Sequence, residues 1–416
     1  MLFAVLLRKV IHQGRLSVID ANGRRHDFGQ PVPEFPSVTI KLHKRSLHWQ
    51  LAFNPRLIIG EAYMDGTLTV EEGGTIYDFL DLVASNIGRT PVDWVDRVMT
   101  GWRLASRRLA QANPIGQSKQ NVAHHYDLSD QLYEMFLDPR RQYSCAYFAR
   151  PDMTLEEAQL AKLNHIAGKL QIQPGQTVLD IGCGWGGMAM HLAENCKARV
   201  TGITLSEEQH TYAVKKAEER GLSDRVKFHL RDYRDEPGIY DRIVSVGMFE
   251  HVGVPNYDTF FKCVRDRLTD DGVALIHTIV QMNPPRPTNP WLAKYIFPGG
   301  YCPAPSEVVG SIERSMLWAD DMECLRLHYA ETVRKWREAF MASWDEAKEL
   351  YDERFCRMWE FYLAGSEMGF RRDGHMVIQF QLSKEQTAVP LTRDYLYQPV
   401  GEPAVQQDSY RPRRVA

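Results

Sequence analysis

A glycine-rich segment is the first part of the sequence whose residue types and spacing predict chemistry. It follows a short β-branched run typical of a buried strand and reads Asp180-Ile181-Gly182-Cys183-Gly184-Trp185-Gly186-Gly187. Glycines after a strand let the backbone approach a ligand that a Cβ would repel, and a following helix presents free N–H groups. The segment therefore indicates a nucleotide-binding loop at the carboxyl end of a strand.

The glycine-rich loop is compatible with two classes of nucleotide cofactor. A dinucleotide oxidoreductase expects an acid at the end of the second strand, but residues 202–206 contain none. The loop instead resembles motif I of class I methyltransferases, in which an acid stands two residues before the first glycine. Residues 230–234, after the third predicted strand, resemble the adenine-contacting stretch of those enzymes. We therefore expect S-adenosylmethionine and methyl transfer.

Strands and helices alternate from about residue 155, as they must to position such a loop. The predicted strands are 177–181, 199–203, 226–230, 241–246 and 273–279, and the predicted helices are 155–170, 188–195 and 206–219. Strands near 323–329 and 376–382, with a helical region over 333–363, would finish the sheet. Prolines interrupt residues 283–320, where an active-site cover would sit. The pattern predicts an α/β fold with a doubly wound, mostly parallel sheet.

The residues before this sheet predict a separate small α+β domain. Residues 38–42 and 57–59 have the pattern of strands, and residues 76–84 that of a helix. Residues 91–112 form one amphipathic pattern with Trp94, Trp102 and several arginines. Such a helix lies either in a membrane interface or between domains with its apolar face buried in protein.

The composition excludes several classes of protein. The 416 residues are 44% hydrophobic and 25% charged, as in ordinary globular proteins, which argues against a disordered or fibrous chain. The net charge of −3 gives no overall attraction to nucleic acid, and no apolar run approaches the length of a membrane-spanning helix. Seven cysteines without a CxxC pair favour a reducing compartment, and we expect a cytoplasmic protein.

Several further blocks occur in one order and together identify a family resemblance. They are residues 121–128, 143–148, 178–187, 241–253, 275–279 and 294–300, and residues 60–68 add a looser match in the first domain. These blocks resemble cyclopropane-fatty-acyl-phospholipid synthases. The resemblance implies a Rossmann-like class I methyltransferase sheet with a helical lid insertion. It also implies a small lipid-binding domain over 1–90 and a catalytic domain over 116–397. The sequence pattern adds an amphipathic helix and linker over 91–115 and a flexible tail over 398–416.

The resemblance also implies the reaction and its partners. Family members transfer a methylene unit from S-adenosylmethionine to the cis double bond of a phospholipid acyl chain, through a carbocation that bound bicarbonate deprotonates. The substrate is a bilayer lipid, so we expect peripheral contact with the inner face of the membrane, where residues 91–112 are the candidate contact, and a homodimer. Methyl- or methylene-branched products remain an alternative, since the same cation can lose a different proton or gain a hydride. Residues 301–305 depart from the family pattern near the lipid entrance, which bears on the chain length or double-bond position of the substrate.

The resemblance carries two sets of site residues onto this chain. Bicarbonate would be held by Cys145, Glu250, His277, the backbone of Ile279, and Tyr329. The cofactor would be contacted by Tyr126, Ser144, Gly182, Gly184, Thr204, Gln209, Asp232 and Tyr233. Taken singly, Cys145 also fits a buried apolar position, and His277 fits a hydrogen-bonded core histidine. His124 and His125 have no further ligands at metal spacing, so we expect no metal.

Two other functions stay open at this stage. A methyltransferase for a polar small molecule predicts a polar pocket, whereas residues 283–320 are rich in Pro, Trp, Tyr and Phe. A non-catalytic lipid-binding protein with a relict nucleotide fold predicts erosion of the glycine loop or of Glu250, and neither is seen.

Overall fold

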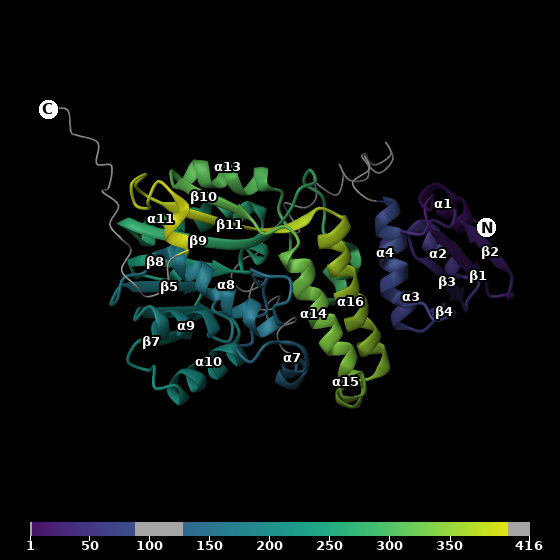
Figure 1. The fold of residues 1–416 in the computed structure, drawn as a ribbon, viewed down its shortest axis with the longest axis horizontal. Coiled ribbons are helices and arrows are strands. Elements are labelled where there is room, and N and C mark those ends of the chain that lie inside the picture. Colours follow the sequence, from purple (N-terminus) through teal and green to yellow (C-terminus); the bar gives the residue numbers. More distant parts are fainter. Residues whose placement is uncertain (1, 88–127, 398–416) are drawn as a thin grey trace.

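The computed structural model describes residues 2–87 and 128–397 of the chain. Two β-sheets organise these residues, one of four strands and one of seven. Figure 1 shows the small sheet at one end of the molecule, with helices between it and the large sheet. The helix and linker predicted over 91–115, the tail over 398–416 and Tyr126 lie outside the described residues.

The N-terminal unit packs its helices on the four-stranded sheet, whose order is β2-β1-β3-β4. Strands β1 and β3 are parallel, and the other two pairings are antiparallel. The strands are β1 (Arg15–Ile19), β2 (Arg25–Phe28), β3 (Ser37–Leu42) and β4 (Leu68–Glu71), and the helices are α1 (Leu2–Val10), α2 (Leu47–Phe53), α3 (Pro55–Met64) and α4 (Ile76–Ile87). Leu16, Ile40, Leu51 and Phe79 are buried in its core.

Two of the three elements predicted in this unit are confirmed. The strand over 38–42 lies within β3, and the helix that begins at Ile76 continues to Ile87. The strand predicted over 57–59 is wrong, because those residues lie inside α3. Pro55 stands in the first turn of α3, where its fixed φ is suited to a helix and its missing N–H would have no partner.

The seven-stranded sheet has the order β10-β11-β9-β8-β5-β6-β7. Its strands are β5 (Thr177–Ile181), β6 (Arg199–Thr204), β7 (Val226–Leu230), β8 (Tyr240–Val246), β9 (Leu268–Gln281), β10 (Trp318–Cys324) and β11 (His375–Ser383). Strands β5 to β9 pair with one another in parallel, whereas β11 pairs antiparallel with both β9 and β10 at one edge. The predicted doubly wound, mostly parallel sheet is confirmed.

Helices cover both faces of this sheet. One core packs the sheet against α8 (Leu155–Leu170), α9 (Gly187–Asn195) and α10 (Glu207–Glu219). The other packs it against α11 (Tyr257–Arg267) and α13 (Pro305–Ser315). Helix α8 begins with a capping box, in which Thr154 and Glu157 each accept a hydrogen bond from the other's backbone N–H.

The helical region predicted over 333–363 is three helices rather than one. They are α14 (His328–Ala342), α15 (Trp344–Leu350) and α16 (Glu353–Arg372), and Asp352 caps α16 by accepting a hydrogen bond from the N–H of Phe355 at 2.6 Å. The strand predicted near 323–329 is also displaced. It ends at Cys324, and Arg326 has a φ of +27°, so Tyr329 lies in the first turn of α14 instead.

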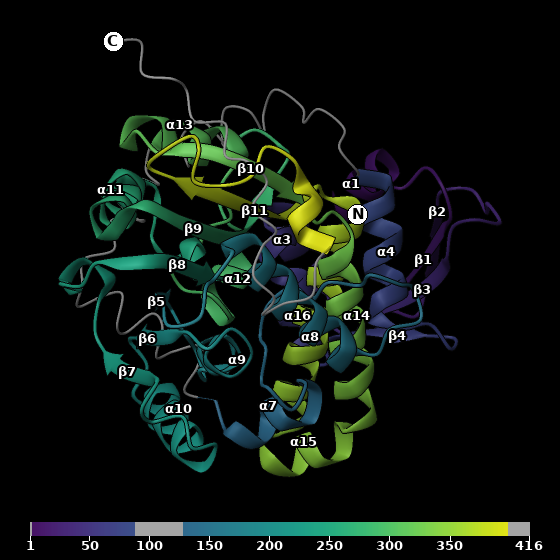
Figure 2. The ribbon, with the colours of Figure 1, turned by 60° about the vertical axis from the view of Figure 1, so that its left-hand side comes forward.

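Two short helices complete the surroundings of the sheet. Helix α7 (Asp130–Phe136) precedes it in sequence, and α12 (Pro290–Tyr295) lies with α13 in the proline-rich insertion. Figure 2 shows α14 and α16 side by side between the large sheet and α4. Within the described ranges, no helix is long and apolar enough to cross a bilayer.

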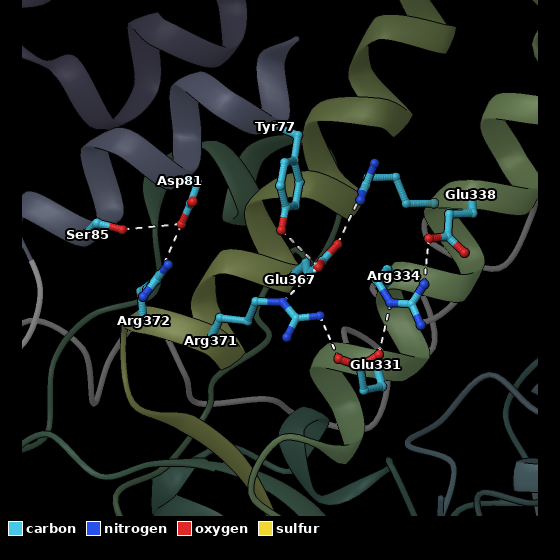
Figure 3. Close-up of polar contacts among 10 residues, drawn as sticks. Tyr77, Asp81, Ser85, Glu331, Arg334, Glu338, Glu367, Arg371 and Arg372 are labelled. Atoms are coloured by element: carbon cyan, nitrogen blue, oxygen red, sulfur yellow. Dashed lines mark hydrogen bonds and ion pairs between the residues drawn. The ribbon is translucent and has the colours of Figure 1, made fainter. Parts of the chain in front are cut away.

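An ionic cluster joins α4 of the N-terminal unit to α14 and α16 (Figure 3). Glu367 on α16 is fully buried, and its carboxylate accepts hydrogen bonds from Tyr77 Oη at 3.2 Å, Arg371 Nε at 2.8 Å and Arg337 Nε at 3.1 Å. The Arg371 guanidinium also bonds Glu331 of α14 at 2.7 Å. A buried carboxylate that compensates two guanidinium groups holds the two units in one arrangement.

Removing this buried carboxylate should destabilise the protein. We expect Glu367→Ala to lower the free energy of unfolding in urea by roughly 3 kcal/mol, because Arg337 and Arg371 would lose their compensating charge. The matched control is Glu338→Ala, whose carboxylate pairs with Arg334 on the exposed side of α14. That change should cost less than about 1 kcal/mol. Equal losses in the two variants would contradict the assigned role of Glu367.

Candidate functional site

An open pocket lies at the carboxyl ends of β5, β6, β7 and β8. Its empty volume is ≈ 1160 Å³, including space open to solvent. The walls come from residues 141–144, the glycine loop, the ends of these strands and residues 246–252. Ligands of doubly wound sheets bind at this edge.

The glycine loop forms the floor of the pocket and needs its glycines for two reasons. Gly182, Gly184 and Gly186 all have a positive φ, of +78°, +55° and +81°, which disfavours a side chain. A Cβ on Gly182 would also stand 2.7 Å from the Cβ of Met248, so a side chain there would displace the opposite wall.

Seven of the eight residues predicted to contact a cofactor line this one pocket. They are Ser144, Gly182, Gly184, Thr204, Gln209, Asp232 and Tyr233. The eighth, Tyr126, lies outside the described residues. The structure thus brings these residues together from four separate segments of the chain.

Two of these segments are held by short-range hydrogen bonds. The Thr204 hydroxyl, at the end of β6, donates to Gln209 Oε1 at 3.1 Å. Asp232 accepts a hydrogen bond from the N–H of Arg234 at 2.9 Å and forms an ion pair with its guanidinium at 2.7 Å. These bonds orient the side chains of Gln209 and Asp232 at the pocket wall.

The second predicted group surrounds the end of β9. The carboxylate of Glu250, in the 3₁₀ turn Phe249–His251, accepts a hydrogen bond from the N–H of Ile279 at 2.6 Å. Cys145, Ile279 and Tyr329 pack in one apolar cluster. His277 stands two residues before Ile279 on the same strand, where Gln379 Nε2 lies 3.2 Å from its Nδ1. The structure thus joins Glu250 to Ile279 by a hydrogen bond and places Cys145 and Tyr329 in the same cluster as Ile279. His277 lies two residues from Ile279 on the same strand.

Burial controls the protonation of this group. It raises the pKa of Glu250 to about 7, and the hydrogen bond from Ile279 offsets only part of that effect. Burial also lowers the pKa of His277 well below its ordinary value and raises that of the Cys145 thiol. At neutral pH the imidazole is therefore uncharged, the thiol keeps its proton, and Glu250 is poised between its two forms.

Two buried polar atoms of this group lack a hydrogen-bond partner among the described residues: Glu250 Oε2 and His277 Nε2. Since the amide of Gln379 donates to Nδ1, the neutral ring carries its proton on Nε2. The site therefore offers one acceptor and one donor inside a dry cluster. Such a pair suits a small ligand that has both a hydroxyl and an oxygen acceptor.

Lys162 is a site residue that was absent from the sequence prediction. It is fully buried on α8, and its Nζ donates to Gln142 Oε1 at 2.6 Å and to Ser144 Oγ at 2.9 Å, both of which belong to pocket-lining residues. The helical spacing indicates that Lys162 faces the core, because Ala158 and Ile166, four residues to either side, lie on the buried face of the same helix.

The charge of Lys162 acts on both parts of the site. Burial lowers its pKa to about 8, against the opposing effect of Asp138, Cys145 and Asp180. Burial also raises the pKa of Asp180, at the head of the glycine loop, to about 7, and Lys162 counteracts that rise. We interpret Lys162 as a positioning residue that holds residues 142–144 against the sheet and compensates Asp180.

Comparisons with known proteins agree on one family. The family model described as mycolic acid cyclopropane synthetase matches residues 115–380. The chain is 41% identical over 323 residues to the cyclopropane-fatty-acyl-phospholipid synthase of Escherichia coli (strain K12), covering 75% of this chain and 79% of that protein.

Solved structures give the same result. A cyclopropane synthase from Mycobacterium tuberculosis superposes with a TM-score of 0.62 at 36% identity, covering 66% of this chain and 99% of that one. A mycolic acid cyclopropane synthase in complex with SAH and CTAB gives a TM-score of 0.61 at 36% identity, covering 65% and 99%. The predicted class I methyltransferase fold is confirmed.

Replacing Lys162 should weaken binding in the pocket. We expect Lys162→Met to reduce the affinity for S-adenosylhomocysteine, measured by calorimetry, about tenfold, because Ser144 and Gln142 lose a charged donor. In the wild type the affinity should also fall as the pH rises through about 8, where Lys162 loses its proton, and this dependence should be absent from the variant.

Lys169→Met provides the matched control, since Lys169 is equally buried on the same helix but pairs with Glu323 at 2.6 Å, away from the pocket. It should lower the thermal midpoint without changing the affinity. A similar loss of affinity in both variants would show that Lys162 acts only through general stability.

Proposed function

Because this chain belongs to the mycolic acid cyclopropane synthetase family, we propose that it is an S-adenosylmethionine-dependent cyclopropane-fatty-acyl-phospholipid synthase. It adds a methylene unit to the cis double bond of an unsaturated phospholipid acyl chain. The observation that carries the proposal is the 41% identity to the Escherichia coli synthase over three quarters of the chain. The pocket at the glycine loop supports it.

The reaction requires the protein to align the methyl donor with the alkene and to provide a dry site that stabilises a cation. When bound, S-adenosylmethionine supplies an electrophilic methyl group, and the alkene that receives it is a poor nucleophile, so the walls must align the two. The resulting positive charge on the acyl chain has to be kept from water. Tyr143 lines the pocket, its ring lies 5.1 Å from that of Trp336, and its hydroxyl lies 2.8 Å from that of Tyr362. Aromatic faces of this kind stabilise a nearby cation.

For the cofactor, the proposed contacts are the seven residues of the pocket together with Tyr126. Ser144 is held by Lys162, and Gln209 by Thr204, so neither side chain has to be ordered when the cofactor binds. The backbone of the glycine loop allows close approach of the cofactor, and Asp232 and Tyr233 stand at the end of β7 for the adenine side.

Bicarbonate is the proposed second cofactor, held by Cys145, Glu250, His277, the N–H of Ile279, and Tyr329. The free acceptor on Glu250 and the free donor on His277 fit its hydroxyl and one of its oxygens. A bicarbonate bound there would supply the base that removes the proton from the added methyl group. Glu250 in its ionised form orients that ion by accepting its hydroxyl proton in a hydrogen bond.

The substrate resides in a bilayer, so we propose that the protein works as a peripheral membrane protein in the cytoplasm and assembles as a homodimer. In this scheme residues 1–90 bind lipid and residues 116–397 perform the reaction. The separate sheets of the two parts of the chain support this division of labour.

The direct test is a product analysis. We expect incubation with S-adenosylmethionine and vesicles that contain a cis-monounsaturated phospholipid to add one CH₂ unit to the fatty esters, detected by mass spectrometry. Fragmentation should give the pattern of a ring. An unchanged mass would refute the proposal, and a branched pattern would assign the chain to a related lipid C-methyltransferase.

The role of Glu250 predicts a specific pH profile. In the wild type, turnover should rise as the pH passes about 7, because the carboxyl must ionise to accept the hydroxyl proton. Glu250→Gln should lower turnover about 100-fold and remove that rise, while the affinity for S-adenosylhomocysteine changes less than about threefold.

Stability supplies a second readout for the same variant. Because burial raises the folded-state pKa of Glu250 above its ordinary 4.5, the wild type should lose stability relative to Glu250→Gln between about pH 4.5 and pH 7. Glu360→Gln is the control, since Glu360 is a buried carboxyl with a raised pKa that bonds Tyr63 outside the site. It should leave the pH profile of turnover unchanged. Equal losses of turnover and of cofactor affinity in Glu250→Gln would point to a purely structural role.

A further inference from the structure

Helix α2 of the N-terminal unit presents two large aromatic side chains to solvent. Trp49 is 62% exposed and Phe53 is 78% exposed, and they stand four residues apart on one face of the helix. Leu47 and Leu51 on the opposite face are buried in the core of the unit. Fold stability therefore explains one face of α2 and leaves the aromatic face unexplained.

The charged residues in the sequence around α2 are all basic. Residues 35–60 contain no aspartate or glutamate, whereas Lys44 and Arg45 precede α2 and Arg56 follows it, all three exposed. Helix α1, which packs against α2, adds exposed Arg8 and Lys9. The protein as a whole has a net charge of −3, so this basic character is local.

This surface is structurally connected to the catalytic part of the chain. Helix α3, directly after α2, carries Gly60, and a Cβ there would stand 2.4 Å from Trp291 Nε1 on α12. Glu61 of α3 accepts hydrogen bonds from Lys294 Nζ at 2.6 Å and from Tyr295 Oη at 2.8 Å. The insertion that contains α12 then reaches the site, because the N–H of Tyr301 donates to the carbonyl oxygen of Glu250 at 3.0 Å.

We propose that the α2 surface, formed by Trp49 and Phe53 with the flanking Lys44, Arg45 and Arg56, is where the protein lies on an anionic phospholipid bilayer. Exposed aromatic side chains insert at the level of the headgroups, and basic side chains around them pair with lipid phosphates. The inference rests on the proposed function, which requires access to a bilayer lipid, and names the surface that provides it.

The charges argue against a second copy of the chain as the occupant. A symmetric contact through α2 would bring the same three basic residues of each copy together without an acidic partner on either side. An anionic membrane supplies the missing negative charge, and its interface accepts aromatic rings without requiring a shaped groove.

Vesicle binding tests the proposal on the full-length protein. We expect wild-type protein to sediment with vesicles of phosphatidylglycerol and phosphatidylethanolamine, and the double variant Trp49→Ala/Phe53→Ala to bind them about tenfold more weakly. Lys44→Gln/Arg56→Gln should weaken binding to a similar extent and reduce its sensitivity to salt. Trp318→Ala is the matched control, because Trp318 is an exposed tryptophan on β10 of the large sheet, and it should bind as the wild type does.

Three further measurements make the test decisive. The difference in fluorescence between wild type and Trp49→Phe should shift to the blue when vesicles are added, and the S-adenosylhomocysteine affinity of the double variant should equal that of the wild type. Unaltered vesicle binding by the double variant would overturn the proposal, as would a change in its oligomeric state measured by analytical ultracentrifugation. Vesicle binding that depends on α2 without any CH₂ gain in the lipids would refute the proposed function and leave the membrane surface standing.

Discussion

The burial of the Glu250 carboxyl is the constraint on which the site depends. An acid in a dry environment is costly, and here it is tolerated because the N–H of Ile279 bonds one oxygen while burial raises its pKa to about 7. Three distant parts of the chain provide the dryness. Cys145 comes from the segment before the sheet, Tyr329 from α14, and the insertion contacts the Glu250 backbone through Tyr301. The sheet therefore supplies the position of the acid, and the added elements supply its environment.

A second electrostatic element, Lys162, lies between the cofactor pocket and this acid. Its bonds to Gln142 and Ser144 fix one wall of the pocket, and its charge compensates Asp180 beneath the glycine loop. The buried ammonium of Lys162 lies beside the pocket, whereas burial favours the uncharged forms of the Cys145 thiol and the His277 ring. A cation formed on the acyl chain would find aromatic faces and a carboxylate there, which is the arrangement that favours its formation.

The sequence allowed the large sheet to be predicted well, because buried parallel strands read as apolar runs that glycine loops and amphipathic helices separate. Prediction from sequence was less reliable where a segment has the composition of one element but lies in another. The run Leu57-Ile58-Ile59 has the composition of a strand, yet Pro55 and tertiary packing place it in a helix. Tyr329 was predicted as a site residue from the family resemblance. It was placed in a strand, but the chain turns at Arg326 and Tyr329 lies in α14. Lys162 was missed because a lysine on a helix normally lies in solvent, and only its partners explain its burial. The cofactor and bicarbonate roles remain predictions.

The contact between the N-terminal unit and α16 also bears on how the chain is made. Ala364 of α16 belongs to the hydrophobic core of the small sheet, and Phe361 packs against it. The bonds from Tyr63 to Glu360 and from Tyr77 to Glu367 span 297 and 290 residues. At roughly 5–20 residues per second, a ribosome needs on the order of 15–60 s to supply the missing helix. The nascent N-terminal unit therefore lacks these contacts for that time, and its packing is completed only by a helix from the far end of the chain.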